Sequence, residues 1–71
     1  IAVPAAHNGR IFIGSFDHNF YCIDAGTGRE IWRFKTGGEV HNDTSPLILN
    51  NLIYFTSFDN FLYCIDMDGK E

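Results

Sequence analysis

The chain has 71 residues, of which 45% are hydrophobic and 20% charged, and its formal net charge is -4. A domain of this length buries only about 60% of the surface that its unfolded chain exposes, so it is marginally stable alone. The acidic balance argues against nucleic acid as a partner, and no apolar run reaches the roughly 18 residues of a membrane-spanning helix.

Short apolar segments bounded by turn residues are predicted to be β-strands. In chain order they span 10–15, 19–24, 30–35, 46–50, 52–57 and 61–66. Segments 6–10 and 49–52 carry Asn at positions that suit turns with positive φ. Since no segment shows helical spacing, the sequence predicts an all-β antiparallel fold.

The predicted strands are apolar on both faces. In segment 52–57, Ile53 and Phe55 point one way while Leu52 and Tyr54 point the other. An antiparallel sheet with one face in water would alternate apolar and polar residues. We therefore expect each sheet to be covered on both sides.

The sequence contains an internal repeat with a period of about 42 residues. Ten of the 21 positions from 4 to 24 carry the same residue 42 positions later. The repeated residues are Pro4, Asn8, Ile11, Ser15, Phe16, Asp17, Tyr21, Cys22, Ile23 and Asp24. A one-residue deletion then aligns Gly28 with Gly69.

Four-stranded antiparallel sheets of about 40 residues, each covered by a copy of itself, are the blades of a β-propeller. We assign residues 1–37 to a first blade and 38–71 to a second, which ends before its outer strand. Since the chain also lacks an initiator Met, we expect it to be an internal piece of a longer protein. A small β-sandwich is the alternative, but it explains neither the period nor the doubled motif.

Residues 22–32, CIDAGTGREIW, resemble the tryptophan-docking motif of the PQQ-like (quinoprotein) repeat, Ala-x-Asp-x-x-Thr-Gly-x-x-x-Trp. The matching residues are Asp24, Thr27, Gly28 and Trp32, with Asp66 and Gly69 equivalent in the second copy and Cys22 in place of the usual Ala. The resemblance implies a ring of six to eight blades in which Trp32 docks one blade onto the next. WD40 repeats have a similar period, but their Gly-His and Trp-Asp signatures are absent.

Asp24 can fold its carboxylate onto the amide of Gly26 or Thr27, and Gly28 allows a positive φ. Trp32 can then spread over a neighbouring sheet and donate its indole N–H to a backbone carbonyl. An ordinary core Trp beside an ordinary turn would look similar, so the docking role comes from the resemblance.

The cysteines are expected to be buried thiols, because packed sheets lie about 10 Å apart whereas disulfide Cα atoms lie within about 7 Å. The sequence alone leaves a disulfide between Cys22 and Cys64 open. His7 and His18 are expected in turns, and no metal spacing is present. Asp17 and Asp59 are explained by their turns, so we predict no catalytic residue; Gly37 and Gly38 are also read as a turn.

The most polar cluster comprises His41, Asn42, Asp43 and Thr44, which should run toward the central channel of a propeller. It is either a solvated loop or a contact for a small molecule or a cation.

Two functions follow from the resemblance. The first is a non-catalytic scaffold, ligand-sensing or protein-interaction segment without a cofactor. The second is a blade pair of a dehydrogenase that uses PQQ and calcium to oxidise alcohols or sugars. The vicinal cysteines of the catalytic relatives do not occur in this chain, which favours the first. The expected partners are further blades or copies of the chain, with a protein or small molecule at the channel, and the implied location is the periplasm or cell envelope.

Overall fold

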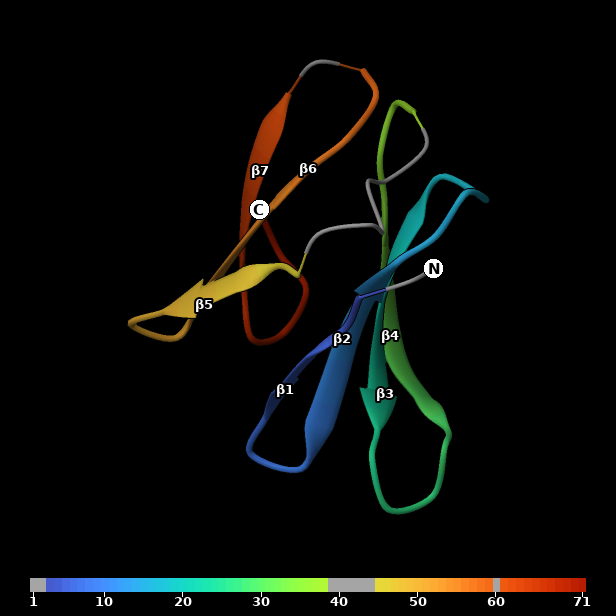
Figure 1. The fold of residues 1–71 in the computed structure, drawn as a ribbon, viewed down its shortest axis with the longest axis vertical. Helices are drawn as coiled ribbons and strands as arrows, with labels where there is room; N and C mark the ends of the chain where they lie inside the picture. The colour runs from blue at the N-terminus through green and yellow to red at the C-terminus, as the bar shows by residue number, and fades with distance from the viewer. Residues whose placement is uncertain (1–2, 39–44, 60) are drawn as a thin grey trace.

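The computed structural model describes residues 3–38, 45–59 and 61–71, and within these ranges the secondary structure consists of strands joined by turns (Figure 1). The first antiparallel sheet contains β1 (Ala5–His7), β2 (Arg10–Gly14), β3 (Asn19–Asp24) and β4 (Glu30–Lys35), in that order. The second contains β5 (Leu47–Leu49), β6 (Leu52–Thr56) and β7 (Leu62–Asp66). The predicted all-β antiparallel fold is confirmed. None of the described residues forms a helix long and apolar enough to cross a membrane.

Strand β1 corrects the sequence prediction, which placed Ala6 and His7 in a turn. Ala6 pairs with Ile11, and His7 pairs with Arg10. The turn is confined to Asn8 and Gly9, with φ of 51° and 75°, as a two-residue type I′ hairpin requires. Alanine has a weak intrinsic preference for strands, so the pairing with β2 decides this segment rather than its composition.

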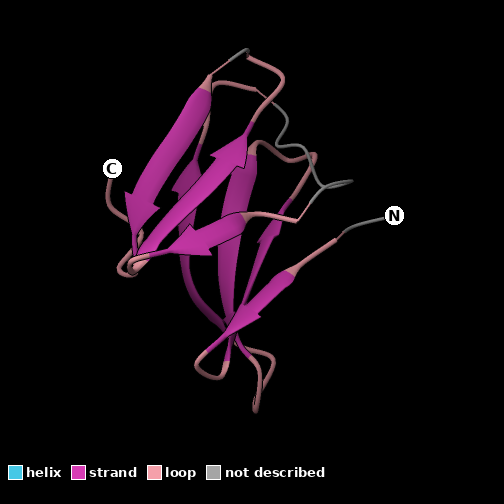
Figure 2. Cartoon of the chain, turned by 60° about the vertical axis from the view of Figure 1, so that its left-hand side comes forward, coloured by secondary structure: helices cyan, strands magenta, loops and turns pink. Residues whose placement is uncertain are grey.

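The two sheets lie face to face as two layers (Figure 2). Their backbones approach each other most closely at β1 and β5. Farther from this contact, larger side chains occupy the space between the layers. On the face of the first sheet that looks toward the second, β1 contributes Ala5, whereas β2, β3 and β4 contribute Phe12, Phe20 and Trp32. The side chains on this face are small at β1 and large at β4, which is consistent with a distance between the two sheets that grows from β1 to β4.

The core lies between the sheets. Its buried members are Phe12, Phe20, Cys22, Ile53, Phe55 and Ile65. The rings of Phe20 and Phe55 stack across the interface, with centroids 4.0 Å apart and planes 4° apart. Burial of one such side chain stabilises a fold by about 1.5–3 kcal/mol, and an aromatic pair adds about 0.5–1.5 kcal/mol. Neither sheet could bury these groups without the other.

The cysteines are both free thiols. Cys22 is fully buried, and it pairs in register with Phe12 on one side and Trp32 on the other. Because its side chain is small, the two aromatic rings can approach to 6.1 Å between centroids. Burial raises the pKa of the Cys22 thiol. Cys64 was also expected to be buried, but it is only half-buried, because its side chain faces away from the first sheet.

Replacing Phe20 by Ala should lower the free energy of unfolding by about 3–5 kcal/mol, because the side chain is 1% exposed and its stacking partner would border a cavity. The matched control is Phe16→Ala, the same chemical change at a side chain that is 57% exposed, for which a change within about 0.5 kcal/mol is expected. Urea unfolding followed by circular dichroism measures both. Equal losses in the two variants would contradict this account of the core.

Candidate functional site

Trp32 on β4 makes the main polar contact between the two sheets. Its Nε1 donates a hydrogen bond to the carbonyl oxygen of Met67 over 3.0 Å. The indole lies directly against Gly69, where an added Cβ would sit 2.6 Å from Trp32 Cδ2. The position after β7 is therefore filled by the tryptophan of the preceding sheet, and only a residue without a side chain fits there.

The turn that receives Trp32 is held by Asp66, the last residue of β7. Its Oδ1 accepts hydrogen bonds from the backbone N–H groups of Asp68 and Lys70, over 2.9 and 3.0 Å. Gly69 supplies a φ of 78°, which favours glycine. The turn orients the Met67 carbonyl, which also accepts a hydrogen bond from Arg10 over 3.2 Å. One carbonyl thus binds two side chains of the first sheet.

The first repeat contains the equivalent turn. Asp24 Oδ1 accepts hydrogen bonds from the N–H groups of Gly26 and Thr27, over 2.8 and 3.0 Å, and Thr27 Oγ1 accepts one from Arg29 over 3.2 Å. Gly28 has a φ of 75°, close to that of Gly69. Beyond its chain neighbours, no atom of the described residues lies within 4 Å of a Cβ built on Gly28. The same turn is therefore covered by an indole in the second repeat and open in the first.

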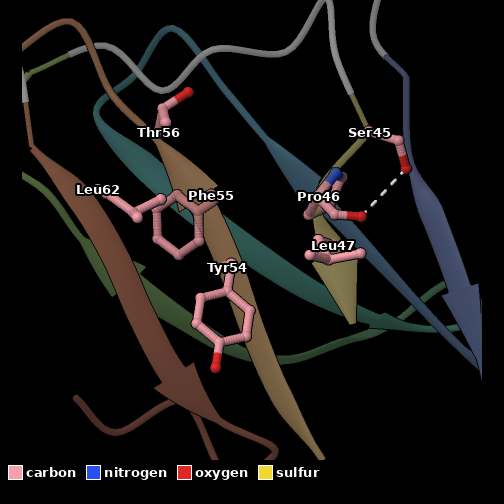
Figure 3. A pocket seen from close by; sticks show the side chains of 7 residues that line it. All are labelled: Ser45, Pro46, Leu47, Tyr54, Phe55, Thr56 and Leu62. Carbon is pink, nitrogen blue, oxygen red and sulfur yellow. Dashed lines mark hydrogen bonds between the residues drawn. The ribbon is translucent and has the colours of Figure 1, made fainter. Parts of the chain in front are cut away.

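The outer face of the second sheet carries an apolar pocket of about 310 Å³ (Figure 3). Its lining comes from β5, β6, β7 and the residues beside them: Ser45, Pro46, Leu47, Tyr54, Phe55, Thr56 and Leu62. The repeat aligns Leu47, Tyr54 and Leu62 with Ala5, Phe12 and Phe20 on the face of the first sheet that the second sheet covers. Leu47 and Leu62 are 58% and 68% exposed. The pocket thus lies where the first sheet has its inter-sheet core.

The hairpin tips of the two sheets carry the repeated Asp-Tyr pairs. Asp59 Oδ1 accepts the Phe61 N–H over 3.0 Å, and Tyr63 donates its hydroxyl to Asp59 Oδ2 over 2.6 Å. Asp17 accepts the Asn19 N–H over 3.0 Å and the Tyr21 hydroxyl. In each pair the hydrogen bond from the tyrosine is the largest cause that lowers the pKa of the aspartate.

The second pair also reaches the first sheet. The N–H of Gly37, just after β4, lies 3.1 Å from Asp59 Oδ2 and 3.3 Å from the Tyr63 oxygen. Sequence reasoning missed this contact, because it treated Gly37 and Asp59 as parts of two independent turns. The repeated spacing of Asp and Tyr was the one signal that could have pointed to a shared role.

The remaining predicted site residues are not gathered into a site. The cluster His41, Asn42, Asp43 and Thr44 lies outside the described residues. The Nε2 atom of His7 is 3.1 Å from the Asn8 side-chain amide, and His18 lies in the β2–β3 connection with a φ of 73°. Within the described ranges, no three His, Cys, Asp or Glu side chains lie close enough together to hold a metal ion.

Comparison with known families gives a match over nearly the whole chain. Residues 2–71 are similar to the family described as outer membrane protein assembly factor BamB. The search of curated proteins finds no matching sequence.

The two turn glycines provide a test of the tryptophan contact. Gly69→Ala and Gly28→Ala both place a side chain at a positive φ, which costs each variant a similar amount, about 1 kcal/mol. Gly69→Ala additionally drives its Cβ into the indole ring. We expect a clearly larger fall in the urea midpoint for Gly69→Ala than for Gly28→Ala. Equal falls would mean that Trp32 does not cover Gly69 in solution.

Acid should destabilise the fold through the turn aspartates. Hydrogen bonds from backbone N–H groups lower the pKa of Asp24 and Asp66, and tyrosine hydroxyls lower that of Asp17 and Asp59. Because each folded pKa lies below the unfolded value of about 3.9, their stabilisation is complete above that pH and is lost as pH falls through the folded pKa. Urea midpoints should therefore change little from pH 7 to 5 and fall below about pH 4.

The double variant Asp24→Asn, Asp66→Asn provides the control for the acid prediction. It removes the carboxyl groups of two of the four turn aspartates, so its urea midpoint should decline less between pH 5 and pH 2. An unchanged acid decline would assign the effect to other groups.

Proposed function

Because the chain belongs to the PQQ-like repeat family described as outer membrane protein assembly factor BamB, we propose that it is a non-catalytic propeller segment. Its role is that of a scaffold: its two repeat sheets pack with further sheets, and the assembly presents surfaces to a protein partner or a small ligand. The observation that carries this proposal is the contact of Trp32 with the turn at Met67 and Gly69.

Several of the described side chains that could do chemistry are engaged in building turns and the interface between the sheets. Asp24 and Asp66 bind the N–H groups of their own turns, and Cys22 is buried between aromatic rings. Cys22 is therefore inaccessible as a nucleophile, and the thiolate form that would react is disfavoured by burial. These assignments support a structural role for Asp24, Asp66 and Cys22.

Trp32 is the docking side chain of this scaffold. Asp66 and Gly69 build the turn that receives it, and Asp24, Thr27 and Gly28 build the equivalent turn of the first repeat. Removal of the indole would delete both an apolar contact and a hydrogen bond between the sheets, whereas Trp32→Phe would delete the hydrogen bond and keep an aromatic ring. The docking role is supported by the closeness of the ring to Gly69.

The proposed location is outside the cytoplasm, in the periplasm or cell envelope. It is supported by the family description, which names an assembly factor for outer membrane proteins. A protein partner at one end or face of the assembled sheets is proposed on the same ground.

Equilibrium dialysis against PQQ, with and without Ca²⁺, tests the non-catalytic assignment. The dialysis uses both the chain itself and the longest polypeptide that contains it. Dye-linked oxidation assays with alcohols and sugars then follow on the same proteins. We expect no calcium-dependent binding of PQQ and no turnover. Tight calcium-dependent binding with turnover would instead assign the protein to the quinoprotein dehydrogenases, with residues 41–44 as the first segment to mutate.

A further inference from the structure

The contact of Gly37 with Asp59 and Tyr63 joins the two sheets at the opposite end of the interface from Trp32. Gly37 follows the last strand of the first sheet, whereas Asp59 lies in the turn before β7 and Tyr63 lies near the start of β7. Trp32, near the middle of β4, reaches the turn after the end of β7. The outer strand of one sheet is therefore held by the next sheet at two points, near the middle of β4 and just beyond its C-terminal end.

The site on the second sheet accepts glycine because of space, not because of backbone conformation. A Cβ at Gly37 would lie 2.8 Å from Asp59 Oδ2, and one at Gly38 would lie 3.0 Å from the Asp59 nitrogen. Neither glycine is among the residues with positive φ. A larger residue at either position would force the connection after β4 or the Asp59 group to shift, so the contact favours glycine in this connection.

The first sheet presents the same pair without such a donor. Asp17 accepts hydrogen bonds from the Asn19 N–H and the Tyr21 hydroxyl, as Asp59 does from Phe61 and Tyr63. Among the described residues, no backbone N–H of another sheet reaches Asp17 as Gly37 reaches Asp59. Tyr21 is further positioned by the Arg33 guanidinium, 5.3 Å from its ring centroid.

The face of the first sheet beside Asp17 repeats the other features of the occupied site. Gly28 is the open counterpart of Gly69, the glycine that the indole covers. The apolar side chains Ile11, Ile13 and Ile23 are only partly buried on this face. The face therefore combines an uncovered turn that could receive an indole ring, an apolar centre and an Asp-Tyr pair. The second sheet holds β4 with the same three features.

We propose that Asp17 and Tyr21 form a binding site for the backbone N–H of a glycine that follows the tryptophan-bearing outer strand of another repeat sheet. The occupant has the pattern of residues 30–38, EIWRFKTGG, and packs on the outer face of the first sheet. This inference rests on the proposed scaffold function and deepens it, because it names what the scaffold recognises: a glycine link, by its N–H and its lack of a side chain.

The first arm of the test compares Asp59→Asn with Asp17→Asn in the chain itself. The two aspartates differ in the Gly37 contact and otherwise bind equivalent groups. Asp59→Asn should lower the urea midpoint more than Asp17→Asn, and it should accelerate hydrogen exchange at the Gly37 amide, which Asp17→Asn should leave unchanged. Equal midpoints, or a Gly37 amide that exchanges as in an unstructured peptide, would overturn the proposal.

The second arm supplies the occupant by placing an additional copy of residues 3–44 in front of the chain. In this extended polypeptide, Asp17→Asn in the original copy should lower the midpoint as much as Asp59→Asn does. Gly37→Ala in the added copy should remove that extra sensitivity. An unchanged, small effect of Asp17→Asn overturns the proposal, and so does an added copy that does not fold onto the first sheet. Neither arm involves PQQ, so failure here is distinguishable from failure of the proposed function.

Discussion

The packing of one sheet face against the other, centred on the stacked rings of Phe20 and Phe55, is the interaction on which the rest of the structure depends. Each sheet is one layer thick, so a face is buried only where a second layer covers it. Phe12 and Ile53 are completely buried because they lie between the layers, whereas Leu47 and Leu62 on the outer face of the second sheet remain more than half exposed. The apolar side chains on the opposite face of the first sheet, Ile11, Ile13 and Ile23, are only partly buried, because no second layer of the described residues covers them.

Apolar packing alone does not determine how two sheet faces are aligned, and here polar contacts at two ends of the interface supply the alignment. Trp32 reaches the Met67 carbonyl at one end, and the Gly37 N–H reaches Asp59 and Tyr63 at the other. Hydrogen bonds are directional, and each of these contacts also requires a glycine where a side chain would collide. The core supplies most of the stabilisation, while these contacts select one register and one angle between the sheets.

Because the sequence repeats, the two sheets present equivalent faces. The face of the first sheet that is covered by the second corresponds, residue for residue, to the outer face of the second sheet, where Leu47, Tyr54 and Leu62 line the pocket. The outer face of the first sheet likewise corresponds to the inner face of the second. A head-to-tail interface of this kind either closes into a ring or continues as an open stack. The proposed scaffold role rests on this correspondence of faces and on the engagement of Asp24, Asp66 and Cys22 in turns and core packing.

The sequence by itself determined the repeat, the all-β class, most strands and the turns at Asn8, Gly9 and Asp24, because these depend on residues a few positions apart and on a period that recurs. Strand β1 was missed because two alanines do not indicate a strand, and only pairing with β2 makes them one. Tertiary structure alone decided that Gly37 is a contact rather than a simple turn, that Arg10 shares the Met67 carbonyl with Trp32, and that Cys64 is less buried than Cys22. Gly37 lies 22 positions from Asp59, and Arg10 lies 57 from Met67. Such contacts arise from the placement of one sheet on the other, which no local pattern encodes.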